Sequence, residues 1–167
     1  VITIDTTEKV TLEITGNINM PGYDKGCFIS IENACKELTI INEDTVNVED
    51  NIFLCNKNKD ATVTFEGGTY EALTDDGVPI IVNGGVVNLK NVKFNATGSV
   101  YYGRIVQNYW SDLDGTINIQ DGTILDDNNR SGNFPVYPCI DLGTVNMYGG
   151  TITSSKGKGY IGIKAPK

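Results

Sequence analysis

The residues best suited to chemistry lie in two polar stretches of the chain. Residues 96–115 contain Tyr101, Tyr102, Arg104, Tyr109, Trp110, Asp112 and Asp114, and residues 125–138 contain Phe134 and Tyr137. Aromatic rings have apolar faces on which sugars stack, and neighbouring polar groups can bond the sugar hydroxyls. We therefore interpret these residues as a glycan-binding face. Two alternatives stay open: the rings pack the loops down, or they form a partner interface.

Acidic residues in the same stretches offer hard oxygen ligands for calcium. The candidates are Asp112 and Asp114 in "SDLDG" and Asp126 and Asp127 in "LDDNN". The EF-hand pattern is not met, because no glutamate follows at the required position. Aspartate is also common in turns. The sequence therefore predicts no required cofactor, with calcium as the alternative.

An enzymatic mechanism finds little support. The chain has no histidine, which excludes Ser-His and Cys-His nucleophiles. Its two arginines, Arg104 and Arg130, lie in different stretches. Paired carboxylates of a glycosidase would have to come from Asp112 with Asp114, or from Asp126 with Asp127. We therefore assign no catalytic residue.

Four cysteines are present, at positions 27, 35, 55 and 139. None forms the close pair that zinc sites use. Cys27 and Cys35 bracket "FISIENA", a spacing that a disulfide could close. The alternative is buried free thiols, because cysteine is among the most buried residue types.

Composition and charge exclude several classes of protein. The 167 residues carry a net charge of −8, so no basic surface is expected for nucleic acid or an anionic membrane. No apolar run is long enough to span a bilayer. Threonine, valine and isoleucine alternate with turn-forming glycine, asparagine and aspartate, which favours an all-β fold.

A repeated phrase organises the chain. The segments "VTLEITGNI", "LTIINEDTV", "TVTFEGGTY", "VVNLKNVKF", "TINIQDGTI" and "TVNMYGGTI" begin at residues 10, 38, 62, 86, 116 and 144. Each has an alternating strand, a short corner and a second strand. A further strand is expected between successive copies, at residues 27–33, 51–56, 79–84, 104–109, 138–143 and 160–165.

This period predicts a single domain, residues 1–167, folded as a parallel β-solenoid with about six turns and three short strands per turn. Residues 96–115 and 125–138 are expected as inserted loops, and residues 1–9 as an edge strand or cap. The pairs Val63/Phe65, Val87/Leu89, Ile117/Ile119 and Val145/Met147 are expected to face inward in ladders. An antiparallel sandwich is the alternative.

The phrases "GTINIQDGTIL" and "GTVNMYGGTITSS" resemble the right-handed parallel β-helix repeats of the pectate-lyase-like superfamily. The resemblance is greatest to the Gly-Gly-Thr-Ile repeats of bacterial cell-surface and adhesin proteins, and it covers residues 10–163. It implies the fold more than the function, because this fold carries lyases, hydrolases, tailspikes, adhesins and filaments.

The ends of the predicted solenoid would expose unpaired strands, and we find no capping helix in the sequence. We therefore expect an extracellular, non-catalytic structural or adhesive module that contacts neighbouring domains of a longer surface protein, or a fibre subunit that self-associates through its ends. The alternatives are a carbohydrate-active module that binds or cleaves an extracellular polysaccharide, and a phage tail-fibre or tailspike-like domain.

Overall fold

The fold is known from a computed structural model of the chain. It describes residues 1–20, 26–49, 51–73, 80–98, 105–107, 115–130, 140–141, 143–154 and 163–164. Every regular element among them is a β-strand. The strands form three parallel sheets, which we name A, B and C.

Sheet A contains seven strands, and sheets B and C contain six each. Sheet A consists of β1 (Ile2–Ile4), β4 (Cys27–Ile31), β7 (Ile52–Asn56), β10 (Ile81–Asn83), β13 (Val106–Gln107), β16 (Ile140–Asp141) and β19 (Ile163–Lys164). Sheet B consists of β2 (Val10–Ile14), β5 (Glu37–Asn42), β8 (Thr62–Glu66), β11 (Val86–Lys90), β14 (Thr116–Ile119) and β17 (Thr144–Met147). Sheet C consists of β3 (Ile18–Met20), β6 (Thr45–Val48), β9 (Thr69–Leu73), β12 (Lys93–Gly98), β15 (Ile124–Arg130) and β18 (Thr151–Ser154).

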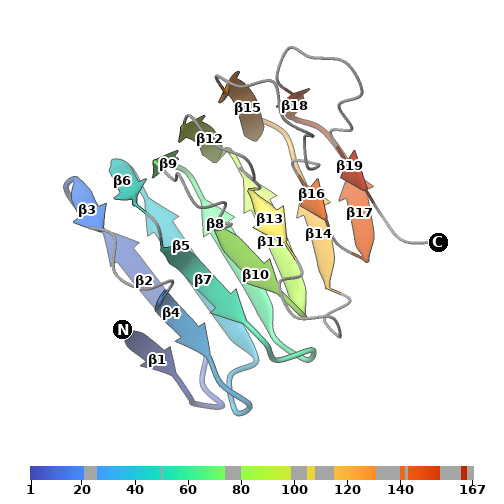
Figure 1. The fold of residues 1–167 in the computed structure, drawn as a ribbon. Helices are drawn as coiled ribbons and strands as arrows, with labels where there is room; N and C mark the ends of the chain where they lie inside the picture. Colours follow the sequence, from blue (N-terminus) through green and yellow to red (C-terminus); the bar gives the residue numbers. More distant parts are fainter. Residues whose placement is uncertain are drawn as a thin grey trace.

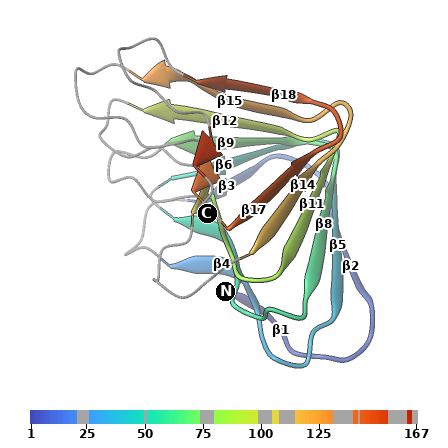
Figure 2. The ribbon, with the colours of Figure 1, turned by 90° about the vertical axis from the view of Figure 1, so that its right-hand side faces the viewer.

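The three sheets stack as a β-solenoid, as the repeat predicts. Within each sheet, a strand pairs in parallel with the strand three places later in the chain, so the polypeptide visits all three sheets in turn. Strands β1 and β19 lie at opposite ends of the stack (Figure 1). Figure 2 shows the strands of sheet B along one side of the solenoid and those of sheet C along another. The antiparallel sandwich is therefore excluded.

The inward ladders of sheet B are confirmed for three of the four predicted pairs, whereas Met147 of the fourth pair is 50% exposed. Val63 pairs with Val87, and Val87 pairs with Ile117. Phe65, Leu89 and Ile119 form a second column beside them. All six side chains are completely buried. Alternating strands thus place their aliphatic residues in one dry interior, which is the main source of stability for such a fold.

One part of the sequence alignment is wrong by one residue. The repeat places Leu38 opposite Thr62, but in the structure Glu37 pairs with Thr62 and Leu38 pairs with Val63. Register in a sheet is decided by which face is buried, because a shift of one residue would turn every side chain to the other face. Leu38 is buried, whereas Glu37 is exposed.

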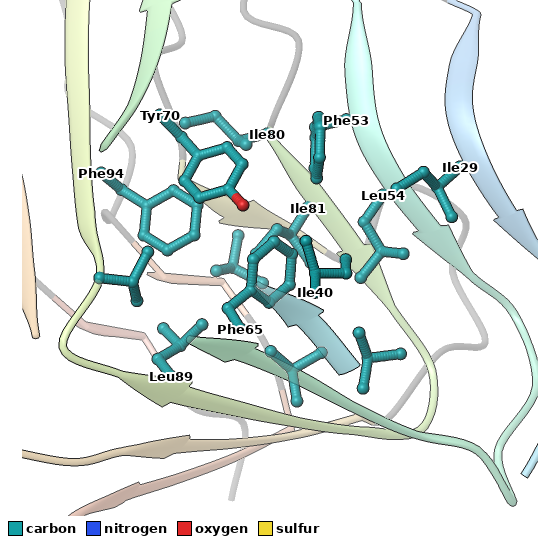
Figure 3. Packing of buried hydrophobic residues seen from close by; sticks show 14 of the residues in the cluster. Ile29, Ile40, Phe53, Leu54, Phe65, Tyr70, Ile80, Ile81, Leu89 and Phe94 are labelled. Carbon is teal, nitrogen blue, oxygen red and sulfur yellow. The ribbon is translucent and has the colours of Figure 1, made fainter. Parts of the chain in front are cut away.

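Four aromatic rings fill the middle of the solenoid (Figure 3). The ring of Tyr70 lies 4.9 Å from that of Phe53, 5.4 Å from that of Phe65 and 5.0 Å from that of Phe94. Phe65 and Phe94 also meet edge to face, at 5.6 Å. Sheets A, B and C each contribute to this cluster, so it joins all three walls of the solenoid.

The corner between sheets B and C requires a left-handed backbone in several coils. Positive φ angles occur at Gly16, Gly67, Gly68, Gly122, Gly150 and Asn91. Glycine adopts this conformation without the steric cost that a side chain brings. Buried Asn42 lies beneath the Gly67-Gly68 corner, where its Oδ1 accepts a hydrogen bond from the amide of Asp44 at 3.0 Å.

In strand β7 of sheet A, inward and outward side chains do not strictly alternate. Phe53 and Leu54 are consecutive, yet both belong to the core. Their amides donate to the same acceptor, the carbonyl oxygen of Ile80, at 2.9 and 3.1 Å. Two donors on one acceptor are typical of a β-bulge. The bulge lets Ile52 and Cys55 face the other side of the sheet, where they form a second apolar cluster with Val82.

Candidate functional site

The predicted glycan-binding or partner face falls outside the described residues. This holds for Tyr101, Tyr102, Arg104, Tyr109, Trp110, Asp112, Asp114, Phe134 and Tyr137. The structure therefore does not test the face, and it stays a prediction.

The sequence predicts an inserted loop at residues 125–138, but residues 125–130 belong to a strand, and residues 131–138 lie outside the described residues. Strand β15 extends from Ile124 to Arg130, so Asp126 and Asp127 lie in a strand. Leu125 is buried and Asp126 is half-buried, as alternation in a strand requires. A register shift follows Asp126, where Asn95 pairs with Asp126 but Thr97 pairs with Asn129. At this bulge β15 contains one residue more than β12.

The cysteines of the described residues are free thiols, so no disulfide joins Cys27 to Cys35. Cys35 lies in the solenoid core, whereas Cys27 packs against the apolar cluster of Ile52, Cys55 and Val82. A hydrogen bond with Cys55, together with burial, raises the pKa of the Cys27 thiol. The same bond lowers the pKa of Cys55. Burial raises the pKa of Cys35. Cys35 is thus a buried free thiol, which is the alternative that the sequence left open.

The outer face of sheet B carries a ladder of amide side chains. Asn146 donates to Asn118 at 2.9 Å, and Asn118 donates to Asn88 at 2.8 Å. Asn88 in turn donates to the hydroxyl of Thr64 at 3.3 Å. Every donor points toward the N-terminal end of the stack, and Asn118 and Asn88 each donate to one neighbour and accept from the other. At every step of the ladder a donor therefore meets an acceptor.

The two ends of the stack expose apolar side chains. At the N-terminal end, Val1 is 90% exposed and Ile2 is 37% exposed. At the other end, Met147 is 50% exposed and Tyr148 is 72% exposed. Met147 continues the buried column of Phe65, Leu89 and Ile119, and among the described strands of sheet B none follows β17 to cover it.

A pocket of about 330 Å³ opens beside β1, β3 and β4. Its lining includes Val1, Ile18, Met20 and Phe28. It belongs to the N-terminal end surface, because β1 and β3 are the edge strands of sheets A and C.

Across the described residues, no group of three or more cysteine, aspartate or glutamate side chains could hold a metal ion. The part of the chain that the structure covers contains no helix with the length and hydrophobicity needed to cross a membrane.

The three stacked parallel sheets define the chain as a parallel β-solenoid. Comparison with protein-family models, curated proteins and solved structures finds no match.

Proposed function

We propose that this chain is a non-catalytic structural or adhesive β-solenoid module that works through its two ends. The observation that carries the proposal is that the edge strands β17 and β18 lack the residues that usually protect a sheet edge. Natural sheets protect exposed edges with charges, prolines or covering segments. Neither β17 nor β18 contains a charged residue or a proline, and Met147 presents an exposed apolar side chain at the edge.

The register shows what would fit on this edge. Val10 and Val145 stand at opposite ends of one inward column, and Leu12 and Met147 at opposite ends of the next. A second copy whose β2 pairs with β17 in the same register would place Val10 on Val145 and Leu12 on Met147. Both apolar ladders of sheet B would then continue. In sheet A the same register places β1 of the second copy at the position of β19, so one of these two short edge strands must be displaced when the contact forms.

The outer face is equally compatible with this contact. The same register would bring Thr11 of the second copy beside Asn146. A threonine and an asparagine already form such a pair at Thr64 and Asn88, 3.3 Å apart. A head-to-tail contact of this kind does not close on itself, so it propagates into a filament. Further coils of a longer polypeptide would use the same edges.

The setting that we propose is extracellular or at the cell surface. Its support is the resemblance of the repeats to the Gly-Gly-Thr-Ile repeats of bacterial surface and adhesin proteins, within the pectate-lyase-like superfamily. A glycan-binding role would depend on residues outside the described part of the chain, so the end surfaces are the better-supported site.

The test is light scattering over a concentration series, with negative-stain imaging of the same samples. We expect the apparent mass to grow with concentration and thin rods to form. Met147→Lys should abolish this growth, because stacking would bury an unpaired charge. The variant should still fold, since Met147 is half exposed in the isolated chain.

The matched control is Gln120→Lys, which adds the same charge on the outer face of an interior coil. Gln120→Lys should associate as the unmodified chain does. A constant monomer mass for the unmodified chain at every concentration would refute self-association, and equal growth in Met147→Lys would refute the proposed edge.

A further inference from the structure

The outer face of sheet A holds two cysteines on successive coils, Cys27 in β4 and Cys55 in β7. Their thiols are hydrogen-bonded to each other. Both also belong to one apolar cluster, in which Cys27 packs against Ile52, Cys55 and Val82. The two sulfur atoms are therefore neighbours, although they belong to different coils.

The pairing of β4 with β7 explains this contact. Cys27 lies opposite Ile52 in the register of the two strands. The next two residues of β7, Phe53 and Leu54, both enter the core. Ile52 and Cys55 are therefore successive side chains on the outer face, where they share a cluster with Cys27.

Packing on the inner face holds the two coils in this position. Phe28 of β4 stacks on Phe53 of β7, with the ring centres 5.7 Å apart. Ile29 and Leu54 pair in register and are both buried. The two cysteines thus project from backbone that the core fixes, and their contact does not depend on the conformation of a loop.

The two sulfurs differ in how readily they lose a proton. The hydrogen bond with Cys27 lowers the pKa of Cys55; the charge of Lys57 assists, whereas burial and Glu32 oppose the effect. The hydrogen bond with Cys55 and burial raise the pKa of Cys27. The pair therefore gives up its first proton while the second stays between the sulfurs. A thiolate formed in this way is the nucleophile of thiol–disulfide exchange.

Cys27 is the sulfur that a reagent can reach. It is partly exposed and lines the pocket of about 330 Å³ at the N-terminal end. Cys55 is only 4% exposed, and Cys35 is completely buried in the core. The pair thus combines one accessible sulfur with a second sulfur directly behind it.

We propose that Cys27 and Cys55 form a reversible disulfide, which ties the coil of β4 to the coil of β7 when the chain meets a small-molecule disulfide. The remaining proton of the pair moves to Cys55, and the Cys27 thiolate attacks the reagent and expels one of its sulfurs as a thiolate. Cys55 then loses its proton to solvent, attacks the Cys27 sulfur and expels the second reagent thiolate. Overall the two cysteines lose two electrons and two protons, and the reagent is reduced to two thiols.

The bond would stabilise the N-terminal part of the stack. A disulfide restricts the unfolded chain, and it does so more when it closes a longer loop. Here the closed loop runs once around the solenoid, from β4 to β7. Disulfides persist in oxidising compartments such as the extracellular space. The disulfide does not depend on self-association of the chain, so either proposal can fail without the other.

The test incubates the folded chain with oxidised glutathione, alkylates the remaining thiols and maps the disulfides by mass spectrometry. A protease that cleaves after glutamate cuts at Glu32 and so separates Cys27 from Cys35. We expect a peptide pair that links Cys27 to Cys55 as the main product. We also expect Tm to rise by about 5–10 °C and to return to its first value when dithiothreitol reduces the bond.

Single substitutions separate the two steps of the reaction. In Cys55→Ser, Cys27 should stop at the glutathione adduct, because the second sulfur is absent, and Tm should not rise. Cys27→Ser should form neither an adduct nor a disulfide at Cys55, because that sulfur is buried. Cys35→Ala is the matched control: it removes a buried cysteine outside the pair and should form the disulfide as the unmodified chain does.

Three results would overturn the proposal. A glutathione adduct that persists on Cys27 in the unmodified chain, or no reaction at all, would show that the two sulfurs do not reach bonding distance. A disulfide from Cys27 to Cys35 or Cys139 would assign a different partner. An unchanged or lower Tm after the Cys27–Cys55 bond has formed would show that the bond does not stabilise the coils that it joins.

Discussion

Replacing Phe65 by alanine should lower the free energy of unfolding by about 3–5 kcal/mol, as expected for a large aromatic residue lost from a packed core. Phe65 is completely buried and contacts Phe53, Tyr70 and Phe94, with ring centres 5.4–6.1 Å away. The cavity would lie where the three sheets meet, so the surrounding strands cannot collapse into it. Chemical denaturation of Phe65→Ala against the unmodified chain measures the loss.

Met147→Ala is the matched control, because Met147 occupies the same inward column at the edge of the stack. Its side chain is 50% exposed, so truncation should cost less than about 1 kcal/mol in the monomer. Measured below the concentration at which chains associate, the two variants should differ several-fold in their effect. Similar losses would contradict the difference in burial between Phe65, inside the core, and Met147, at its edge.

Gly68→Ala should be the second severe substitution. The φ angle of Gly68 is 76°, a region that costs about 1–2 kcal/mol for a residue with a Cβ atom. The new Cβ would also collide with the side chain of Asn42, which is buried beneath the corner. Overpacking of this kind adds about 1–3 kcal/mol, so we expect a total loss of about 2–5 kcal/mol in chemical denaturation.

Gly16→Ala separates the two causes. Gly16 has a similar φ angle of 85°, but a Cβ atom there would meet nothing within 4 Å. Its substitution should therefore show the backbone cost alone, about 1–2 kcal/mol. If Gly16→Ala were as damaging as Gly68→Ala, the contact with Asn42 would not explain the loss.

The sequence predicted the parallel solenoid because its strands repeat whole phrases, including the corner. Val63, Val87 and Ile117 could be placed in one column from alternation and period alone, and the structure pairs them in that way. The same reasoning placed Leu38 one residue out of register. The corner that follows β5 contains one residue more than the corner that follows β8, and only the buried face decides the pairing.

Features that depend on contacts between coils could not be read from the sequence. Phe53 and Leu54 both enter the core because two amides share the carbonyl of Ile80, which strict alternation does not predict. The hydrogen bond from Asn95 Nδ2 to Glu71, on a coil 24 residues earlier, is a contact of this kind. The sequence placed Asp126 and Asp127 in a loop, whereas the structure places them in strand β15, and their role as calcium ligands stays a prediction.

The most direct test of head-to-tail association is a crosslink between two different copies. Thr11→Cys and Asn146→Cys place one new thiol each at the N-terminal and C-terminal edges of sheet B. If β2 of one copy pairs with β17 of another in register, these thiols face each other, at a separation that a disulfide can bridge. We expect mild oxidation to yield a covalent dimer when the two variants are mixed, and none from either variant alone. Dimers from a single variant would indicate a symmetric contact, and the absence of a dimer in the mixture would contradict end-to-end association.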